Sequence, residues 1–170
     1  MKNKILNFII AILFLQYCSA PSYIPKSEEL DVNPYGSFII VYQKTNPTIK
    51  GELLAIDDEK LVVLVDRTSE EKNSYAVELP LKNIDSFTLT YAQPVNYSWS
   101  IFTHTLLCLT HGFYSLISFP INLIVTVSLS AGGALSYKYS EKEMTFEKLK
   151  MFARFPQGFP AAIKLEDIKR

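Results

Sequence analysis

The chain has 170 residues, with 17 basic and 17 acidic side chains, two cysteines and two histidines. This length allows one modest domain, or a small domain plus an accessory element, and it excludes most multi-domain enzymes. Because the formal net charge is zero, no basic field attracts nucleic acid, and we expect no nucleic-acid partner. Charged residues are 20% of the chain, yet residues 86–137 contain none, so the average conceals a long uncharged block.

The N-terminal segment has the features of an export signal. Lys2 and Lys4 precede an apolar run over residues 5–15, which is too short to cross a membrane comfortably. The run ends in Leu15-Gln16-Tyr17-Cys18-Ser19, which resembles the bacterial lipobox. The resemblance implies a lipoprotein signal peptide over residues 1–17 and an acyl anchor on Cys18. The alternatives are an ordinary cleaved signal and an uncleaved anchor, in which Cys18 is incidental.

The residues after Cys18 indicate a destination and a tether. Lipoproteins kept in the inner membrane carry Asp after the lipidated Cys, so by the same resemblance Ser19 favours an exported protein anchored in the outer membrane. Three prolines among polar residues predict that residues 18–34 form a lipidated, extended tether. If Cys18 is acylated, Cys108 has no partner for an intrachain disulfide.

Five short segments rich in β-branched and aromatic residues follow the tether. They predict strands at residues 36–42, 49–56, 61–65, 74–79 and 84–91, joined by short polar turns. We therefore expect residues 35–92 to form a small, closed, five-stranded antiparallel β-barrel. The pattern of residues 51–58, 61–64 and 79–84 resembles that of SH3-like and Sm-like barrels. The resemblance implies the shape and not the ligand, since RNA binding needs a basic patch that this chain lacks.

The uncharged block predicts an apolar helical hairpin over residues 97–138. Its two halves, residues 99–117 and 120–138, each have about the length of one membrane crossing, and Ser118-Phe119-Pro120 joins them. Since this joint is apolar, a hairpin that dips into one leaflet fits better than a complete crossing. The alternative is a folded core, with residues 121–129 as a buried strand or helix. The residues expected in the membrane are Trp99, Phe113, Pro120, Ile121, Leu123 and Ile124.

Aromatic side chains flank the uncharged block on both sides. Before it stand Tyr91, Tyr97 and Trp99, and after it stand Tyr137 and Tyr139. Tyr and Trp favour the membrane–water interface, so we expect both flanks at the same membrane surface.

One group of residues in the block has metal-binding chemistry. On a helix, His104, Cys108 and His111 fall at positions i, i+4 and i+7 of one face, and imidazole with thiolate suits zinc, copper or haem. A site would need a further ligand, and polar contacts between helices explain the same spacing, so we expect no metal and no cofactor. The sequence also has no Gly-x-Ser-x-Gly elbow and no phosphate-binding glycine loop, and we predict no catalysis.

Residues 140–170 predict a closing helix and a tail. An amphipathic helix is expected from about Thr145 to Arg154, where Pro156 stops it and basic side chains suit its C-terminal dipole. The strings His111-Gly112-Phe113, Phe119 to Leu123 and Phe152 to Gly158 look like those of predicted lipoproteins of diderm bacteria.

Together these features predict an α+β protein that is anchored by lipid in the bacterial cell envelope. We expect a structural or interaction role at the membrane, with membrane lipid and an envelope protein as partners. Two alternatives stay open. One is an envelope lipoprotein that binds a lipid or another hydrophobic ligand in a pocket lined by the uncharged block, and the other is a metal- or haem-binding protein.

Overall fold

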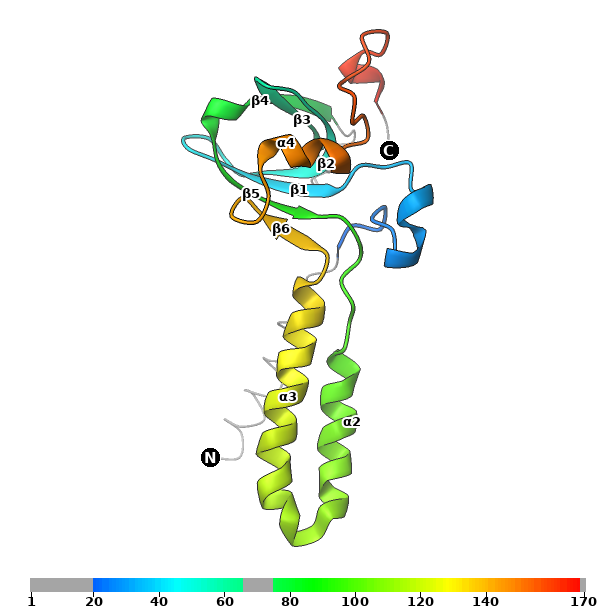
Figure 1. The fold of residues 1–170 in the computed structure, drawn as a ribbon, viewed down its shortest axis with the longest axis vertical. Coiled ribbons are helices and arrows are strands. Elements are labelled where there is room, and N and C mark those ends of the chain that lie inside the picture. Colours follow the sequence, from blue (N-terminus) through cyan, green and yellow to red (C-terminus); the bar gives the residue numbers. More distant parts are fainter. Residues whose placement is uncertain (1–19, 66–74, 169–170) are drawn as a thin grey trace. The chain divides into compact units, whose positions relative to one another are not determined.

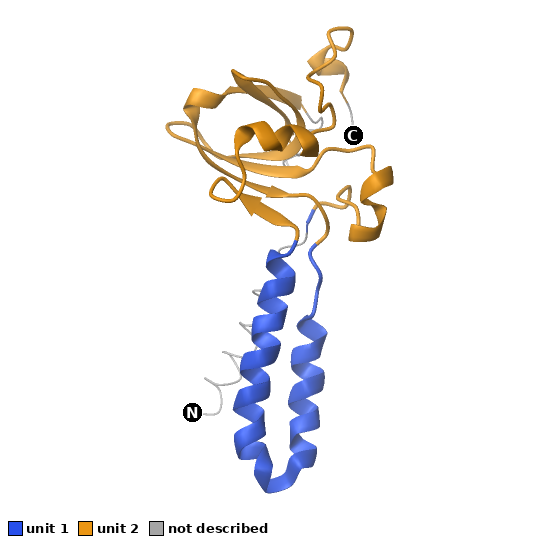
Figure 2. Ribbon diagram, viewed as in Figure 1, with its two compact units in different colours: residues 1–20, 94–136 blue, residues 21–93, 137–170 orange. Residues whose placement is uncertain are grey.

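The computed structural model describes residues 20–65 and 75–168 (Figure 1). The chain forms two compact units (Figure 2): a hairpin unit, Met1–Ala20 with Pro94–Ser136, and a sheet unit, Pro21–Gln93 with Tyr137–Arg170. The fold is α+β, as the sequence predicts. The predicted signal peptide and the predicted lipid attachment site, Cys18, lie outside the described residues.

The sheet unit is built on six antiparallel strands in the order β4-β3-β2-β1-β5-β6. The strands are β1 (Phe38–Gln43), β2 (Ile49–Ile56), β3 (Lys60–Val65), β4 (Tyr75–Pro80), β5 (Ile84–Thr90) and β6 (Lys138–Ser140). The five predicted strands are confirmed within a few residues at each end, because their β-branched and aromatic side chains suit a pleated, half-buried surface.

The prediction of a closed five-stranded barrel is wrong. The sheet is open, with β4 and β6 at its edges, and the sixth strand pairs with β5 so that Thr90 lies opposite Lys138. A three-residue strand is too short to show a period of two in the sequence. Closure depends on strand number, stagger and tilt together, and alternation within single strands specifies none of these.

Two irregularities in strand pairing bend the sheet. The register of β2 against β3 shifts between Leu53 and Ala55, and that of β1 against β5 shifts between Tyr42 and Gln43. Such bulges bend a strand and increase its twist, which accounts for the curled sheet in Figure 1.

Hydrophobic residues cover both faces of the central strands. On one face, Leu53 and Val63 belong to a cluster that extends to Phe87 and to Leu149 of α4 (Phe146–Leu149). On the other face, a second cluster contains Leu54, Ala55, Val62, Leu64 and Ile168, with Phe155 and Phe159 packed against it. Because β2 and β3 are buried on both faces, their sequences read as nearly continuous apolar runs.

The closing helix is shorter than predicted. It consists of α4 and one 3-10 turn, η4 (Lys150–Phe152), and the chain is extended at Ala153. Arg154 therefore lies beyond the helix and not at its dipole end. The helix ends early because the chain next bonds to β2: the backbone N–H of Arg154 donates to the Leu53 carbonyl (3.0 Å), and that of Phe155 donates to the Leu54 carbonyl (2.8 Å).

The segment predicted as an extended tether is packed on the sheet unit at Ile24 and Pro25, whereas residues 26–32 are exposed. Ile24 is only 1% exposed, and its carbonyl accepts a hydrogen bond from Nε2 of Gln93 (2.8 Å). The Pro25 carbonyl accepts a second bond, from the backbone N–H of Gln93 (2.8 Å). A 3-10 helix, η1 (Ser27–Val32), follows. Two further 3-10 turns in the unit are η2 (Leu81–Asn83) and η5 (Leu165–Asp167).

Candidate membrane-insertion site

The hairpin consists of α2 (Ser98–Cys108), η3 (Leu109–Tyr114) and α3 (Ser115–Leu135). The chain reverses at Gly112, whose φ of 57° and ψ of −128° are rarely adopted by residues with a side chain. The predicted turn at residues 118–120 is therefore wrong, since these residues lie inside α3. Pro120 lies inside α3, where it removes one backbone donor and the helix continues past it, whereas Gly112 supplies a backbone conformation that a helix cannot contain.

Small and polar side chains fill the seam between α2 and α3. The buried residues are Ser100 and Cys108 on α2, and Thr126, Ser130 and Gly133 on α3. Asn122 donates from Nδ2 to the Cys108 sulfur (2.9 Å), which links the two helices.

Gly133 marks the closest approach along this seam. A Cβ atom on this glycine would lie 2.5 Å from the carbonyl oxygen of Val95 and 2.7 Å from the ring of Tyr97. Small residues that allow such close approach are typical of helix pairs in membranes.

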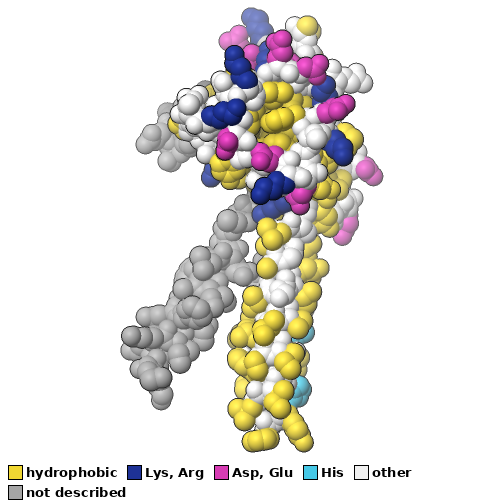
Figure 3. Space-filling view, turned by 60° about the vertical axis from the view of Figure 1, so that its left-hand side comes forward, with side chains coloured by type: hydrophobic (Ala, Val, Ile, Leu, Met, Phe, Trp, Pro, Cys, Tyr) yellow, Lys and Arg dark blue, Asp and Glu magenta, His cyan; other side chains and the backbone are white. Residues whose placement is uncertain are grey.

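Large apolar side chains cover the outside of the hairpin. Phe113 is 82% exposed, Leu116 71% and Phe102 68%, and no Lys, Arg, Asp or Glu interrupts this surface (Figure 3). A soluble helix pair places its apolar side chains in the seam and its polar side chains outside, which is the reverse of this pattern. Within the described part of the chain, Ser98–Leu135 is the one helical stretch long and apolar enough to cross a membrane, by length and composition only.

All six residues predicted to lie in the membrane are exposed on this hairpin. The exposed fraction is 65% for Trp99, 56% for Ile121, 37% for Leu123 and 67% for Ile124, and Phe113 and Pro120 are exposed as well. The alternative prediction, in which the block packs as a folded core, does not match this exposure.

The three candidate metal ligands do not form a metal site. Cys108 is the acceptor of the Asn122 amide, and Nδ1 of His111 is 3.0 Å from the hydroxyl of Ser118. Over residues 20–65 and 75–168, no group of three or more His, Cys, Asp or Glu side chains is placed to hold a metal ion. Polar contacts within the hairpin thus account for Cys108 and His111, and His104 is half-buried on α2.

Both ends of the hairpin join the sheet unit at neighbouring strands. The chain leaves after β5 and returns as β6, and the backbone N–H of Tyr91 donates to the carbonyl of Tyr137 (3.1 Å). The Tyr91 ring stacks on Tyr139 (5.4 Å between centroids) and meets Tyr137 edge-on (5.5 Å). Burial raises the pKa of the Tyr91 phenol, and its hydrogen bond with the Tyr139 side chain adds to this effect. Three of the predicted interfacial tyrosines therefore pack on one another.

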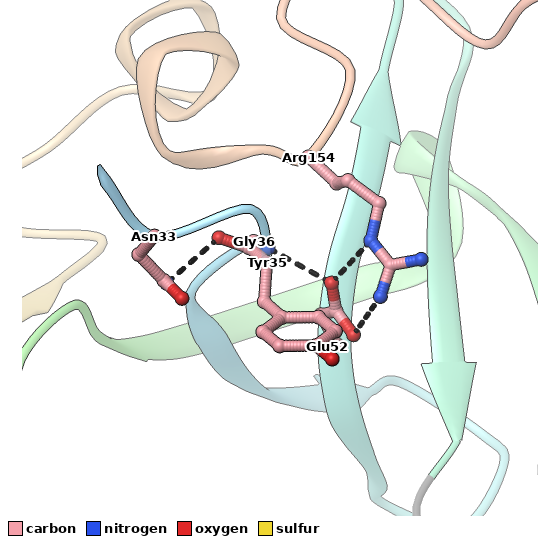
Figure 4. A network of polar contacts seen from close by, with 5 residues as sticks. All are labelled: Asn33, Tyr35, Gly36, Glu52 and Arg154. Carbon is pink, nitrogen blue, oxygen red and sulfur yellow. Dashed lines mark hydrogen bonds and ion pairs between the residues drawn. The ribbon is translucent and has the colours of Figure 1, made fainter. Parts of the chain in front are cut away.

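A buried ion pair in the sheet unit was not predicted from the sequence (Figure 4). The Glu52 side chain is fully buried and accepts from Nε and Nη2 of Arg154, each at 2.7 Å. Its carboxylate also accepts from the backbone N–H of Gly36 (2.8 Å), and the guanidinium lies 5.1 Å from the ring centroid of Tyr35. The one sequence feature that could have indicated this pair is Glu52, which interrupts the apolar run of β2. These contacts join three segments of the sheet unit, so we assign the pair a structural role.

A groove of about 770 Å³ lies beside the edge strand β4. Its lining comes from β1, the turn between β1 and β2, the start of β2, the end of β3, β4 and η2, and includes Phe38, Ile49, Lys50, Val77, Glu78 and Asn83. The uncharged block contributes nothing to this groove, in contrast to the predicted alternative of a pocket lined by that block.

No family model matches the chain, and neither the curated proteins nor the solved structures contain a match to it.

Proposed function

We propose that the protein is a lipid-anchored component of the bacterial cell envelope whose helical hairpin lies in the lipid bilayer. Its role is structural or one of interaction with an envelope partner, and it performs no catalysis. The observation that carries this proposal is the side-chain distribution of the hairpin, with polar and small residues in the seam and large apolar residues outside. Each large apolar side chain moved from water into lipid contributes about 1.5–3 kcal/mol, so the exposed set strongly favours insertion.

Chain connectivity supports a lipid anchor close to the hairpin. Ile24 is hydrogen-bonded to Gln93, which directly precedes the hairpin unit. Cys18 stands six residues before Ile24, and six residues reach at most about 20 Å. Acyl chains on Cys18 would therefore enter the same leaflet as the two ends of the hairpin. One acyl chain holds a protein at a membrane only marginally, and an inserted hairpin makes the attachment firm.

The test separates the hairpin from the lipid anchor. Residues 1–18 are replaced by a cleavable secretory signal without a lipobox, and membranes are extracted with alkaline carbonate. We expect the exported, non-lipidated protein to stay in the membrane pellet, because its hairpin is held by apolar contact and not by the acyl chains. Replacing Ile117, Ile121 and Ile124, which are 64%, 56% and 67% exposed on α3, by serine is expected to move most of the protein into the supernatant.

The matched control replaces exposed apolar residues of the sheet unit. Val32→Ser and Met151→Ser remove side chains that are 79% and 72% exposed, and this variant should stay in the pellet. Release of the unsubstituted, non-lipidated protein as a monodisperse soluble species would contradict the proposal. Lipidation is measured separately, as acyl mass on the N-terminal peptide that disappears in Cys18→Ser.

A further inference from the structure

We infer that the hairpin crosses the entire hydrocarbon layer and presents its bend, residues 110–114, to the lipid headgroups of the opposite leaflet. This inference rests on the proposed function, in which the hairpin lies in the bilayer, and it specifies how deeply. Three features of the hairpin carry it: the length of its arms, the polarity of its bend and the positions of its interfacial aromatic residues.

The second arm of the hairpin, α3, is long enough for a complete crossing. α3 has 21 residues, which at about 1.5 Å per residue span about 32 Å, and the hydrocarbon core of a bilayer is about 30 Å thick. The first arm lies beside α3 over at least half of this length: Val95 and Tyr97 are level with Gly133, and Cys108 is level with Asn122, which is about 16 Å away along α3. Each arm therefore extends from the end joined to the sheet unit as far as the bend.

The bend is polar, in contrast to the apolar joint expected from the sequence. Thr110, His111, Gly112 and Tyr114 occupy it together with one apolar residue, Phe113, and His111, Phe113 and Tyr114 are exposed. At Gly112 the backbone leaves helical geometry. Irregular backbone exposed to lipid does not occur within the hydrocarbon region. The predicted one-leaflet dip depended on an apolar turn at residues 118–120, and these residues lie inside α3.

Interfacial aromatic residues mark two levels on the hairpin. Between residues 98 and 136, Trp99 and Tyr114 are the only Trp and Tyr. Trp99 stands at the start of α2 and is 65% exposed, whereas Tyr114 stands at the bend and is 74% exposed. Trp and Tyr favour both membrane–water interfaces, and Trp99 and Tyr114 stand near opposite ends of the first arm. The bend carries no charged side chain, which suits contact with headgroups of any charge.

Cysteine accessibility tests the inference in the full-length, lipid-anchored chain. Three single reporters are made in a Cys108→Ser parent, which keeps an acceptor for Asn122: Phe113→Cys at the bend, Ile124→Cys within α3 and Asp58→Cys on the sheet unit. The Asp58 side chain is 96% exposed, so its reporter gives the side on which the sheet unit lies. Sealed vesicles are prepared in which nearly all D58C reacts with an external, membrane-impermeant maleimide.

We expect F113C to react only when the maleimide is enclosed within the vesicles, and I124C to react from neither side before detergent is added. If F113C is protected from both sides, as I124C is, the bend lies in the hydrocarbon and the inference is overturned, while the proposed function is retained. If F113C and I124C react from outside together with D58C, the hairpin lies outside the bilayer and both proposals fail. Labelling of the parent provides the background.

Discussion

Glu52 is a carboxylate fully removed from water within an apolar strand, and such a group is tolerated only if its charge is compensated. Arg154 provides two parallel bonds of 2.7 Å, and Gly36 provides a third contact. The pair links β2 to the segment after η4, which is separated from it by about a hundred residues of sequence. The ion pair therefore connects the two stretches of chain, one before and one after the hairpin, that form the sheet unit.

Breaking this pair from one side should be costly. Arg154→Met leaves the buried carboxylate without its cation, and we expect the free energy of unfolding to fall by about 3–5 kcal/mol. Glu52→Gln leaves a neutral amide and should cost less, about 1–3 kcal/mol. Urea titration of the purified chain in a non-ionic detergent measures both values. The control is Lys60→Met, which removes the exposed pair with Glu78 and should change stability little. Equal losses for Arg154→Met and Lys60→Met would refute the structural role.

We expect the sheet unit to lose stability in alkali, because the pKa of Tyr91 is raised in the folded chain. Burial raises the pKa of its phenol above the ordinary value of 10.0, so the unfolded chain loses this proton before the folded chain does. The stabilisation is complete below pH 10.0 and decreases as the pH rises from there toward the folded-state pKa. In urea titrations at increasing pH, we expect the free energy of unfolding of Tyr91→Phe to decrease less steeply than that of the unsubstituted chain. Tyr75→Phe, which removes an exposed phenol from β4, should not change the slope. An unchanged slope in Tyr91→Phe would argue against a buried phenol.

At the scale of elements, two adjacent glycines of α3, Gly132 and Gly133, lie in very different surroundings. A side chain at Gly133 would collide with Val95 and Tyr97, whereas a Cβ atom at Gly132 would have no neighbour within 4 Å. The close contact between the two arms therefore requires that Gly133 has no side chain. At Gly132, by contrast, there is room for a larger side chain.

Gly133→Leu should therefore loosen the hairpin, at a cost of about 1–3 kcal/mol for overpacking. The single tryptophan, Trp99, lies two residues from Tyr97 and reports on this end of the seam. In detergent we expect the midpoint of the thermal change in Trp99 emission to fall in Gly133→Leu and to stay unchanged in Gly132→Leu. Equal behaviour of the two variants would mean that the helices are not in close contact at Gly133.

At the scale of the whole molecule, the hairpin unit is an insertion between two neighbouring strands of one sheet. Since β5 and β6 are paired, both ends of the insertion leave the sheet unit at the same place. The carbonate experiment asks whether this insertion alone holds the chain in a membrane, and the accessibility experiment asks how deeply.

The sequence by itself determined the features that depend on local pattern. Segments rich in β-branched and aromatic residues, bounded by polar turns, placed five strands within a few residues, and the absence of charge between residues 86 and 137 marked an apolar helical hairpin with the six exposed residues expected on it. These signals are local, because a side chain's preference for water or lipid and the period of two do not depend on distant contacts.

Only the tertiary structure decided what depends on pairing between distant residues. It left the sheet open with a sixth strand, moved the turn from Pro120 to Gly112 and ended the closing helix before Arg154. Glu52 and Arg154 each had an ordinary local explanation, as a strand residue and as a helix-end cation, and a separation of about a hundred residues concealed their pairing. Edge pairing, left-handed backbone at a bend and buried ion pairs are set by which segments meet, which no local pattern of residues encodes.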